Sequence, residues 1–250
     1  MRLYFNGCSH TVGVCSGMYD IEQTYPSKLS RKFNAAFINS ASPRSSNDRI
    51  LRTTVEDICS LGYSPEVAII QWSYYDRFET PLMLNEYAEN VKGWKNNRLR
   101  ELEWKQYGPW IQLYRGEENE IFHEFVDKNK TNAINSFLSK VILLDTFLSS
   151  HNIRPVHMFF PATKIMKNNP IIQSLLAQCD TDNFFNSPFL GVESYLDENE
   201  FARGEDNHFL EEAHSFLADS LENFILNNIP LQFNKQNNIN REERMYVYPG

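Results

Sequence analysis

Apolar runs alternate with stretches of helical periodicity along most of this chain. Four apolar segments of strand length lie at residues 3–6, 36–39, 67–72 and 155–160. The third segment is almost continuously apolar, which is typical of a strand buried on both faces of a parallel sheet. We therefore expect the segment 67–72 to be a buried strand of a parallel sheet.

Between these segments, apolar residues recur at the spacing of amphipathic helices. Helices are predicted at 26–33, 132–150, 170–178 and 211–226, and one more begins at Ser46 or Asn47. In the helix that begins at Ser46 or Asn47, Ile50, Val55 and Ile58 share one face, and this helix is expected to end at Gly62. Strands that alternate with helices predict an α/β fold, a three-layer α/β/α sandwich with a mostly parallel central sheet.

The periodic pattern lapses between about residues 80 and 130. This stretch is polar, charged and rich in aromatic residues, and it is longer than an ordinary connection. The aromatic residues are Trp94, Trp104, Tyr107, Trp110 and Tyr114. We expect a helical, aromatic-rich insertion that either packs on the core or forms a lid or wall beside a functional site.

The Asn-rich, charged segment 234–250 is predicted to be a polar C-terminal tail. Its aromatic end offers an alternative, in which it docks as an extra strand on its own subunit or joins a homo-oligomer. Residues 1–233 are then one domain that contains the insertion.

Composition narrows the class of protein. The chain has 250 residues, of which 42% are hydrophobic, enough for one sizeable core. A formal net charge of −8 argues against general nucleic-acid binding, which needs basic surface. No apolar run approaches the ~18 residues of a membrane span, and no secretory signal is visible. The four cysteines lack metal-ligand spacing. We expect a soluble, cytoplasmic protein with free thiols that does not bind membranes.

The first strand runs directly into Gly7-Cys8-Ser9. A glycine lets the backbone turn sharply, and open α/β sheets bind ligands outside the carboxyl ends of their strands. Ser9 is therefore a candidate nucleophile. The alternative is an ordinary tight turn, because Gly-x-Ser is a common string.

A candidate base lies at the other end of the chain, where Glu205-Asp206-Asn207-His208 precedes the last helix. A serine nucleophile needs a base, and that base needs a carboxylate to fix its tautomer. Ser9, His208 and Asp206 are thus a candidate triad, with Glu205 as the alternative acid. In the competing interpretation, Asp206 caps the helix and His208 is a surface residue.

These two segments resemble the SGNH (GDSL-like) hydrolases, whose Gly-Asp-Ser block follows the first strand and whose Asp and His precede the last helix. Cys8 stands where the family has Asp, and the acid–histidine spacing is one residue shorter than the usual Asp-x-x-His. The string 46–50 and the apolar strand that ends at Ser73 are similar to a divergent branch of phage and bacterial proteins.

The family's second and third blocks normally supply oxyanion donors. The second falls at 39–50, where glycine is absent, so the resemblance implies an amide from Arg44, Ser45 or Ser46. The third aligns with residues 73–76 and lacks the asparagine, for which Asn47 is the candidate substitute. The resemblance thus assigns Ser45, Asn47 and Ser73 to oxyanion or substrate binding.

The activity that the resemblance implies is hydrolysis of a small acyl ester, free or on a carbohydrate, by an esterase or O-deacetylase that uses no cofactor or metal. Two alternatives share the fold: an O-acyltransferase that uses the same site, and a weakly active or inactive binding or structural protein. A metal-dependent hydrolase built from His10, Asp206, His208 and His214 is disfavoured, because their spacing matches no zinc motif.

Overall fold

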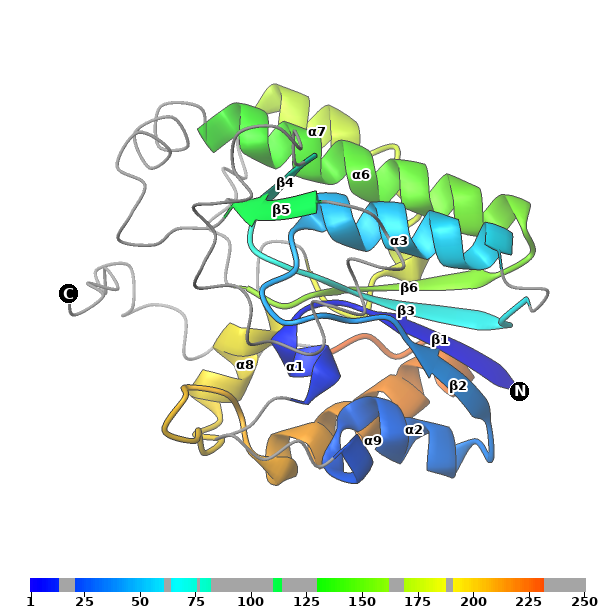
Figure 1. The fold of residues 1–250 in the computed structure, drawn as a ribbon, viewed down its shortest axis with the longest axis vertical. Helices are drawn as coiled ribbons and strands as arrows, with labels where there is room; N and C mark the ends of the chain where they lie inside the picture. The colour runs from blue at the N-terminus through cyan, green and yellow to red at the C-terminus, as the bar shows by residue number, and fades with distance from the viewer. Residues whose placement is uncertain are drawn as a thin grey trace.

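A central sheet of four parallel strands organises the molecule (Figure 1). The computed structural model describes residues 1–13, 21–60, 64–75, 77–81, 110–113, 130–161, 169–187 and 191–231. The strands are β1 (Arg2–Asn6), β2 (Ala36–Asn39), β3 (Val67–Trp72) and β6 (Arg154–Phe159), in the order β2-β1-β3-β6. The four predicted strands are confirmed to within one residue at each end.

Helices cover both faces of the sheet (Figure 1). One face carries α2 (Tyr25–Lys32), α8 (Val192–Glu198) and α9 (Glu211–Asn227), and the other carries α3 (Asn47–Ser60), α6 (Lys130–Ser150) and α7 (Pro170–Leu176). The short helix α1 (Ser9–Val12) and the 3₁₀ turns η1 (Ile21–Gln23) and η3 (Thr181–Asn183) join these elements. The predicted three-layer α/β/α sandwich is confirmed.

The alternation of side chains along β1 and β3 divides the core in two. Leu3 and Phe5 pack in the cluster that includes α2 and α9, whereas Tyr4 packs in the cluster that includes α3 and α6. Along β3, Ile69 and Ile70 divide in the same way. Successive strand residues point to opposite faces, and both faces here are covered, so β3 is apolar except for Gln71.

The order of the strands creates a switch point between β1 and β3. From β1 the chain passes through α2 to β2 on one side, and then through α3 to β3 on the other side of β1. Ligand sites of open α/β sheets lie at such a point, outside the carboxyl ends of the strands. Ser9 and Ser73 both lie there, Ser9 three residues after the end of β1 and Ser73 directly after β3.

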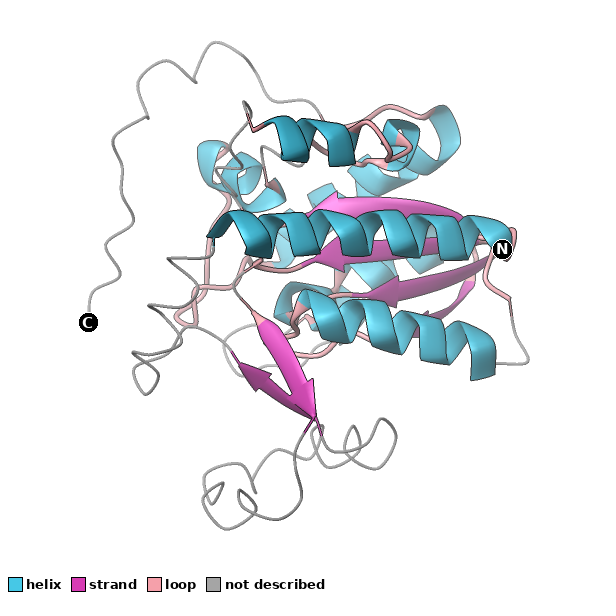
Figure 2. Ribbon diagram, turned by 90° about the horizontal axis from the view of Figure 1, so that it is seen from above, coloured by secondary structure: helices cyan, strands magenta, loops and turns pink. Residues whose placement is uncertain are grey.

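The described parts of the predicted insertion are strands and not the helices that we expected. β4 (Phe78–Pro81) pairs antiparallel with β5 (Trp110–Leu113), and the pair stands apart from the main sheet (Figure 2). Residues 82–109 and 114–129, with Trp94, Trp104 and the predicted lid or wall, lie outside the described residues, as does the predicted tail 234–250. No described helix combines the length and apolarity needed to cross a membrane.

Candidate active site

The serine turn, which we define as Asn6–Gly13, places Ser9 at the start of α1. Cys8 is the N-cap residue of α1, and Gly13 ends the helix in the left-handed conformation, with φ 85°. A Cβ atom on Gly7 would lie 2.7 Å from the Cβ of Gln71. Glycine is therefore required at position 7 by the close approach of β3, as the Gly-x-Ser pattern suggests.

Gln71 of β3 braces the serine turn from below. Its Oε1 accepts hydrogen bonds from the Cys8 backbone N–H (3.4 Å) and from the hydroxyl of Thr11, and its Nε2 lies 3.2 Å from Cys8 Sγ. The Thr11 hydroxyl also bonds Tyr25 Oη of α2 at 2.8 Å. Cys8 thus faces inward, 2% exposed, and presents Ser9 on the outer side of the turn.

Asn6 anchors the same turn to α3. Its Oδ1 accepts the Gly7 backbone N–H at 2.8 Å, and its fully buried Nδ2 bonds the hydroxyls of Thr53 (2.8 Å) and Thr54 (2.9 Å). Buried polar groups are costly unless they are satisfied. The bonds of Asn6 therefore fix the end of β1 where the serine turn begins.

Ser9 and His208 meet although they lie 199 positions apart in the sequence. The His208 Nε2 atom lies 2.8 Å from Ser9 Oγ, within hydrogen-bond distance. The His208 ring is half-buried, and its Nδ1 lies on the side away from the serine. A serine nucleophile and its general base need a contact of this kind, so the geometry is compatible with the candidate roles of Ser9 and His208.

Asp206 faces the other nitrogen of the same ring. Its Oδ2 lies 3.3 Å from His208 Nδ1, and its backbone carbonyl oxygen lies 3.1 Å from that nitrogen. Its Oδ1 accepts the backbone N–H of His208 at 3.2 Å. Asn207 between them has φ 63°, a left-handed conformation that Asn tolerates, which brings the acid and the histidine together across a single residue.

Arg203 holds the histidine loop, which we define as Arg203–Phe209. Its Nη1 donates to the carbonyl of Asn207 at 2.7 Å, and its guanidinium lies 3.9 Å from the ring centroid of Phe209. Its other nitrogens bond Asp197 Oδ1 (2.8 Å) and Glu193 Oε1 (3.2 Å) of α8. The single side chain of Arg203 thus contacts the residues on both sides of His208 and joins the loop to α8.

Glu193 connects Arg203 and the histidine loop to the end of β3. The Tyr74 hydroxyl donates to Glu193 Oε2 at 2.9 Å, and the Glu193 backbone N–H donates to the carbonyl of Phe160 at 2.8 Å. Burial raises the pKa of the Glu193 carboxyl, and Arg203 opposes this shift. Residues after β3 and β6 are in this way linked to the loop that carries His208.

The ring of His10 lies beside the ring of His208, the candidate base. Its ring stacks on Phe160, with centroids 4.1 Å apart, and its centroid lies 4.7 Å from that of His208. Burial, followed by the neighbouring His208, lowers the pKa of His10 well below its ordinary value. His10 therefore stays neutral next to His208.

The segment expected to act as the second block forms a tight turn. The Ser45 backbone N–H donates to the Ser42 carbonyl at 3.2 Å, and Arg44 has φ 63°. Proline at 43 followed by a left-handed residue is the geometry of a type II turn, in which glycine is favoured at the third position. Arg44 thus takes the left-handed conformation that a glycine would favour.

Three residues assigned to oxyanion or substrate binding serve as structural partners in this arrangement. Asn47 Oδ1 accepts the Ser73 backbone N–H (2.8 Å), and Asn47 Nδ2 donates to the carbonyls of Ser73 (3.1 Å) and Tyr74 (3.3 Å). Buried Ser45 donates its hydroxyl to the Ser42 carbonyl at 2.7 Å. Ser73 Oγ accepts Arg77 Nη1 at 2.9 Å.

Two further histidines lie away from the Ser9–His208 pair. His157 is fully buried, and its ring nitrogens bond Trp72 Nε1 (3.1 Å) and Asp145 Oδ1 (3.1 Å). His214 of α9 accepts the backbone N–H of Tyr25, and burial lowers its pKa to about 4. Within the described ranges, no group of three His, Cys, Asp or Glu side chains is arranged to hold a metal ion.

Several residues of the site were not foreseen from the sequence. Gln71, Arg203 and Glu193 act on partners that lie far away along the chain or in a short helix without strong periodicity. The sequence suggests His10 only as a ligand of the disfavoured metal site, and the usable signal for its place here is its position directly after the candidate nucleophile. For the others, the fold alone reveals the contact.

A family model matches residues 12–181, and its description is "Family of unknown function (DUF6071)". The matched residues include neither Ser9 nor His208, so the match does not depend on the candidate catalytic pair. No curated protein matches the sequence.

Among solved structures, a mutant of Axe2, an acetyl-xylooligosaccharide esterase from Geobacillus, is similar with a TM-score of 0.50 and 11% identity over 93% of this chain and 97% of that one. The esterase EstA from Pseudoalteromonas sp. gives a TM-score of 0.49 and 10% identity over 90% and 96% of the two chains. At such identity the first likeness concerns the fold alone. Together with the strand order, it confirms the SGNH-like fold that the sequence predicts.

Proposed function

This chain belongs to the family of unknown function DUF6071 and has an SGNH-like fold, and we propose that it is a serine hydrolase that cleaves a small acyl ester. The observation that carries the proposal is the 2.8 Å contact between Ser9 Oγ and His208 Nε2, across 199 positions of sequence. Asp206 on the far nitrogen of His208 completes the order of groups that a serine nucleophile needs.

In the proposed reaction, Ser9 Oγ attacks the ester carbonyl while His208 Nε2 takes its proton. The Nδ1–H of His208 then points at Asp206, whose carboxylate stabilises the imidazolium. His208 next delivers the proton to the leaving alcohol, which departs and leaves an acyl group on Ser9. A water molecule, deprotonated by His208, releases the acid and restores the serine.

The oxyanion of the tetrahedral intermediate needs donors from the serine turn and its surroundings. Ser9 is the first residue of α1, and the N–H groups of a first helical turn have no acceptor within the helix. We assign its backbone N–H as the first donor. The turn at Arg44 stands where the family's second block supplies a donor, and each such donor is worth about 3 kcal/mol in the transition state.

Intact-mass labelling with a fluorophosphonate tests the proposal. We expect a single adduct on the wild type and none on Ser9→Ala or His208→Ala, with unchanged circular dichroism. Ser215→Ala is the matched control, because this half-buried serine donates its hydroxyl to the backbone carbonyl of Glu211 in α9, and it should label like the wild type. A folded wild type that takes no adduct would overturn the proposal in favour of a binding protein on the same fold.

The first substrates to test are small acetyl esters, including O-acetylated xylooligosaccharides, for which the similar Axe2 is named. Transfer of the acyl group from Ser9 to a second alcohol would use the same residues. Product analysis with an added alcohol separates hydrolysis from acyl transfer.

A further inference from the structure

Arg77 is a half-buried cation at the carboxyl edge of the sheet, directly beyond Ser73 and Tyr74. Its Nη1 donates to Ser73 Oγ at 2.9 Å, and its guanidinium lies 4.6 Å from the ring centroid of Tyr74. Within the part of the chain that the structure describes, no carboxylate forms an ion pair with it. One hydroxyl and one aromatic face satisfy a small part of a group with five N–H donors.

Two other half-buried arginines have carboxylate partners, and a third, Arg154, donates to two backbone carbonyls and to the side-chain oxygen of Asn228. Arg52 lies 2.7 Å from Glu79, and Arg203 lies 2.8 Å from Asp197. A guanidinium that is partly removed from water loses hydration, and an opposite charge normally compensates for the loss. Among the described residues the charge of Arg77 has no such partner, so a bound molecule has a physical reason to supply the countercharge.

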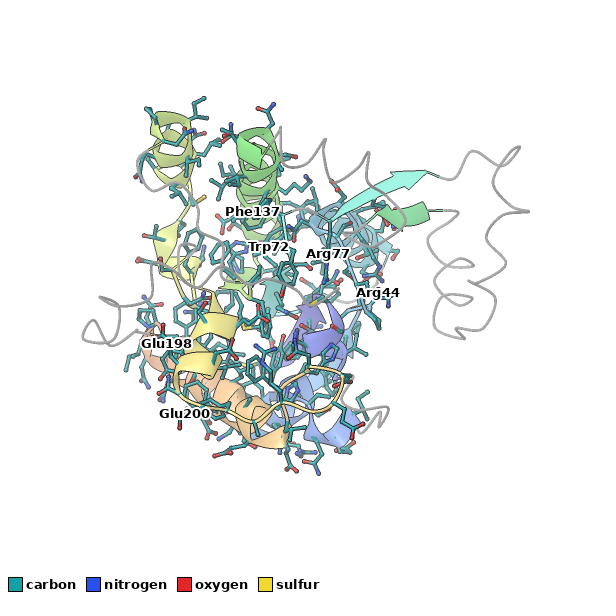
Figure 3. The ribbon with its side chains drawn as sticks, turned by 90° about the vertical axis from the view of Figure 1, so that its left-hand side faces the viewer. Arg44, Trp72, Arg77, Phe137, Glu198 and Glu200 are labelled. Carbon is teal, nitrogen blue, oxygen red and sulfur yellow. The ribbon has the colours of Figure 1, made fainter. Side chains whose placement is uncertain are left out.

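The position of Arg77 places that molecule near the candidate nucleophile. Ser73, its hydrogen-bond partner, follows β3, and the backbone of Trp72 accepts the N–H of Phe160, on which His10 stacks. The charge of Arg77 is also one of those that lower the pKa of His10, the residue after Ser9. Figure 3 looks onto this end of the molecule and shows Arg77 beside Trp72, the last residue of β3, with Arg44 nearby in that view.

We propose that Arg77 binds an anionic group of the ester, a carboxylate or a phosphate, so that the enzyme prefers esters that carry a negative charge near the scissile bond. This inference rests on the proposed hydrolase function. The planar fork of arginine matches the two oxygens of such a group, which fixes the orientation of the substrate as well as its affinity. The charge belongs either to the acyl part or to the alcohol, and the test separates the two.

The kinetic test compares three esters of similar size. Para-nitrophenyl acetate is neutral, para-nitrophenyl hemisuccinate carries its charge on the acyl group, and para-acetoxybenzoate carries it on the alcohol. In Arg77→Gln we expect kcat/KM to fall at least about tenfold for one of the charged esters, the loss typical of a charge-assisted hydrogen bond, and to change little for the acetate. The charged ester that is affected identifies the part of the substrate that Arg77 contacts.

Arg154→Gln is the matched control. Arg154 begins β6 at the opposite edge of the sheet and donates to the carbonyl of Ile225 at 2.6 Å. This variant should leave the ratio between charged and neutral esters as in the wild type. An equal loss on all three esters in Arg77→Gln, or no loss on any, would overturn the proposal, the former because Arg77 would then act on the oxyanion or on the fold.

A binding measurement separates failure of this inference from failure of the hydrolase proposal. Titration calorimetry of the Ser9→Ala protein with succinate and with neutral succinamide needs no turnover. We expect succinate to bind and succinamide not to bind, and binding to weaken at least about tenfold when Arg77→Gln is added. Binding that depends on Arg77 in a protein whose Ser9 takes no fluorophosphonate would uphold the anion site and reject the hydrolase. A labelled Ser9 without succinate binding or charge preference would reject the anion site alone.

Discussion

The serine turn and the histidine loop bring one side chain each to the same contact, but they are built in opposite ways. The serine turn rests on fully buried polar side chains, with Asn6 bonded to α3 and Gln71 bonded across from β3. The histidine loop lies on the surface, where residues 205–207 are exposed and Arg203 ties the loop to α8. The position of Ser9, the proposed nucleophile, is thus coupled to the core, and the position of His208, the proposed base, depends on a few local bonds.

This difference has an energetic consequence. Removing a buried hydrogen-bonding group leaves its partners unsatisfied and costs stability, whereas removing a contact in an exposed loop costs little. We therefore expect substitutions in the serine turn to lower the free energy of unfolding. Substitutions in the histidine loop should lower activity while the protein stays folded.

Asp206→Asn gives the largest expected effect and tests the histidine loop. An amide in place of the carboxylate no longer stabilises the His208 imidazolium, so we expect kcat to fall by about 10³- to 10⁴-fold. The free energy of unfolding should change by less than about 0.5 kcal/mol, as for other exposed positions. Glu205→Gln is the matched control and should retain wild-type kcat in the same assay. The reverse pattern would move the acid to Glu205.

Asn6→Ala tests the serine turn from the opposite direction. The substitution leaves the Gly7 N–H without its acceptor and the hydroxyls of Thr53 and Thr54 without their donor, all in the core. We expect the free energy of unfolding, measured in urea, to fall by about 3 kcal/mol. Asn199→Ala, which removes an exposed bond to the Tyr195 carbonyl, should cost less than about 1 kcal/mol. Equal losses of unfolding free energy in the two variants would show that the buried bonds of the serine turn stabilise the protein no more than an exposed bond does.

The same division explains how much the sequence reveals. The strand at 67–72 and the helix at 211–226 were predictable because their apolar periodicity is local. The pair Ser9 and His208 was predictable because each lies in a short string with recognisable chemistry. The bond between Gln71 and Cys8 joins residues 63 positions apart and leaves no local pattern. The seven-residue helix α8, and β4 and β5 with their distant pairing, are too short to give a periodic signal.

Acid should weaken the support of the serine turn through His214. This residue accepts the N–H of Tyr25, whose hydroxyl bonds Thr11, and burial lowers its pKa to about 4 in the folded state from 6.5 in the unfolded state. Between these values the unfolded chain binds the proton first, so stability falls as the pH drops from 6.5 towards 4, by up to about 3 kcal/mol. Urea unfolding of His214→Asn should decline less over this window than the wild type, and parallel curves would contradict the assignment.

Arg203→Gln gives the smallest expected effect and sharpens the comparison most, because it changes the support of His208 without touching the ring. Loss of the bond to the Asn207 carbonyl and of the contact with Phe209 loosens the loop, so we expect kcat/KM to fall by about tenfold. The free energy of unfolding should fall by about 1 kcal/mol, since the ion pairs with Asp197 and Glu193 are partly exposed. Arg31→Gln removes an exposed ion pair with Glu22 of η1 and should leave both quantities unchanged. If Arg203→Gln instead lowers the free energy of unfolding as much as Asn6→Ala does, the bonds of the histidine loop contribute to global stability as much as those of the serine turn. The contrast between the two regions would then be wrong.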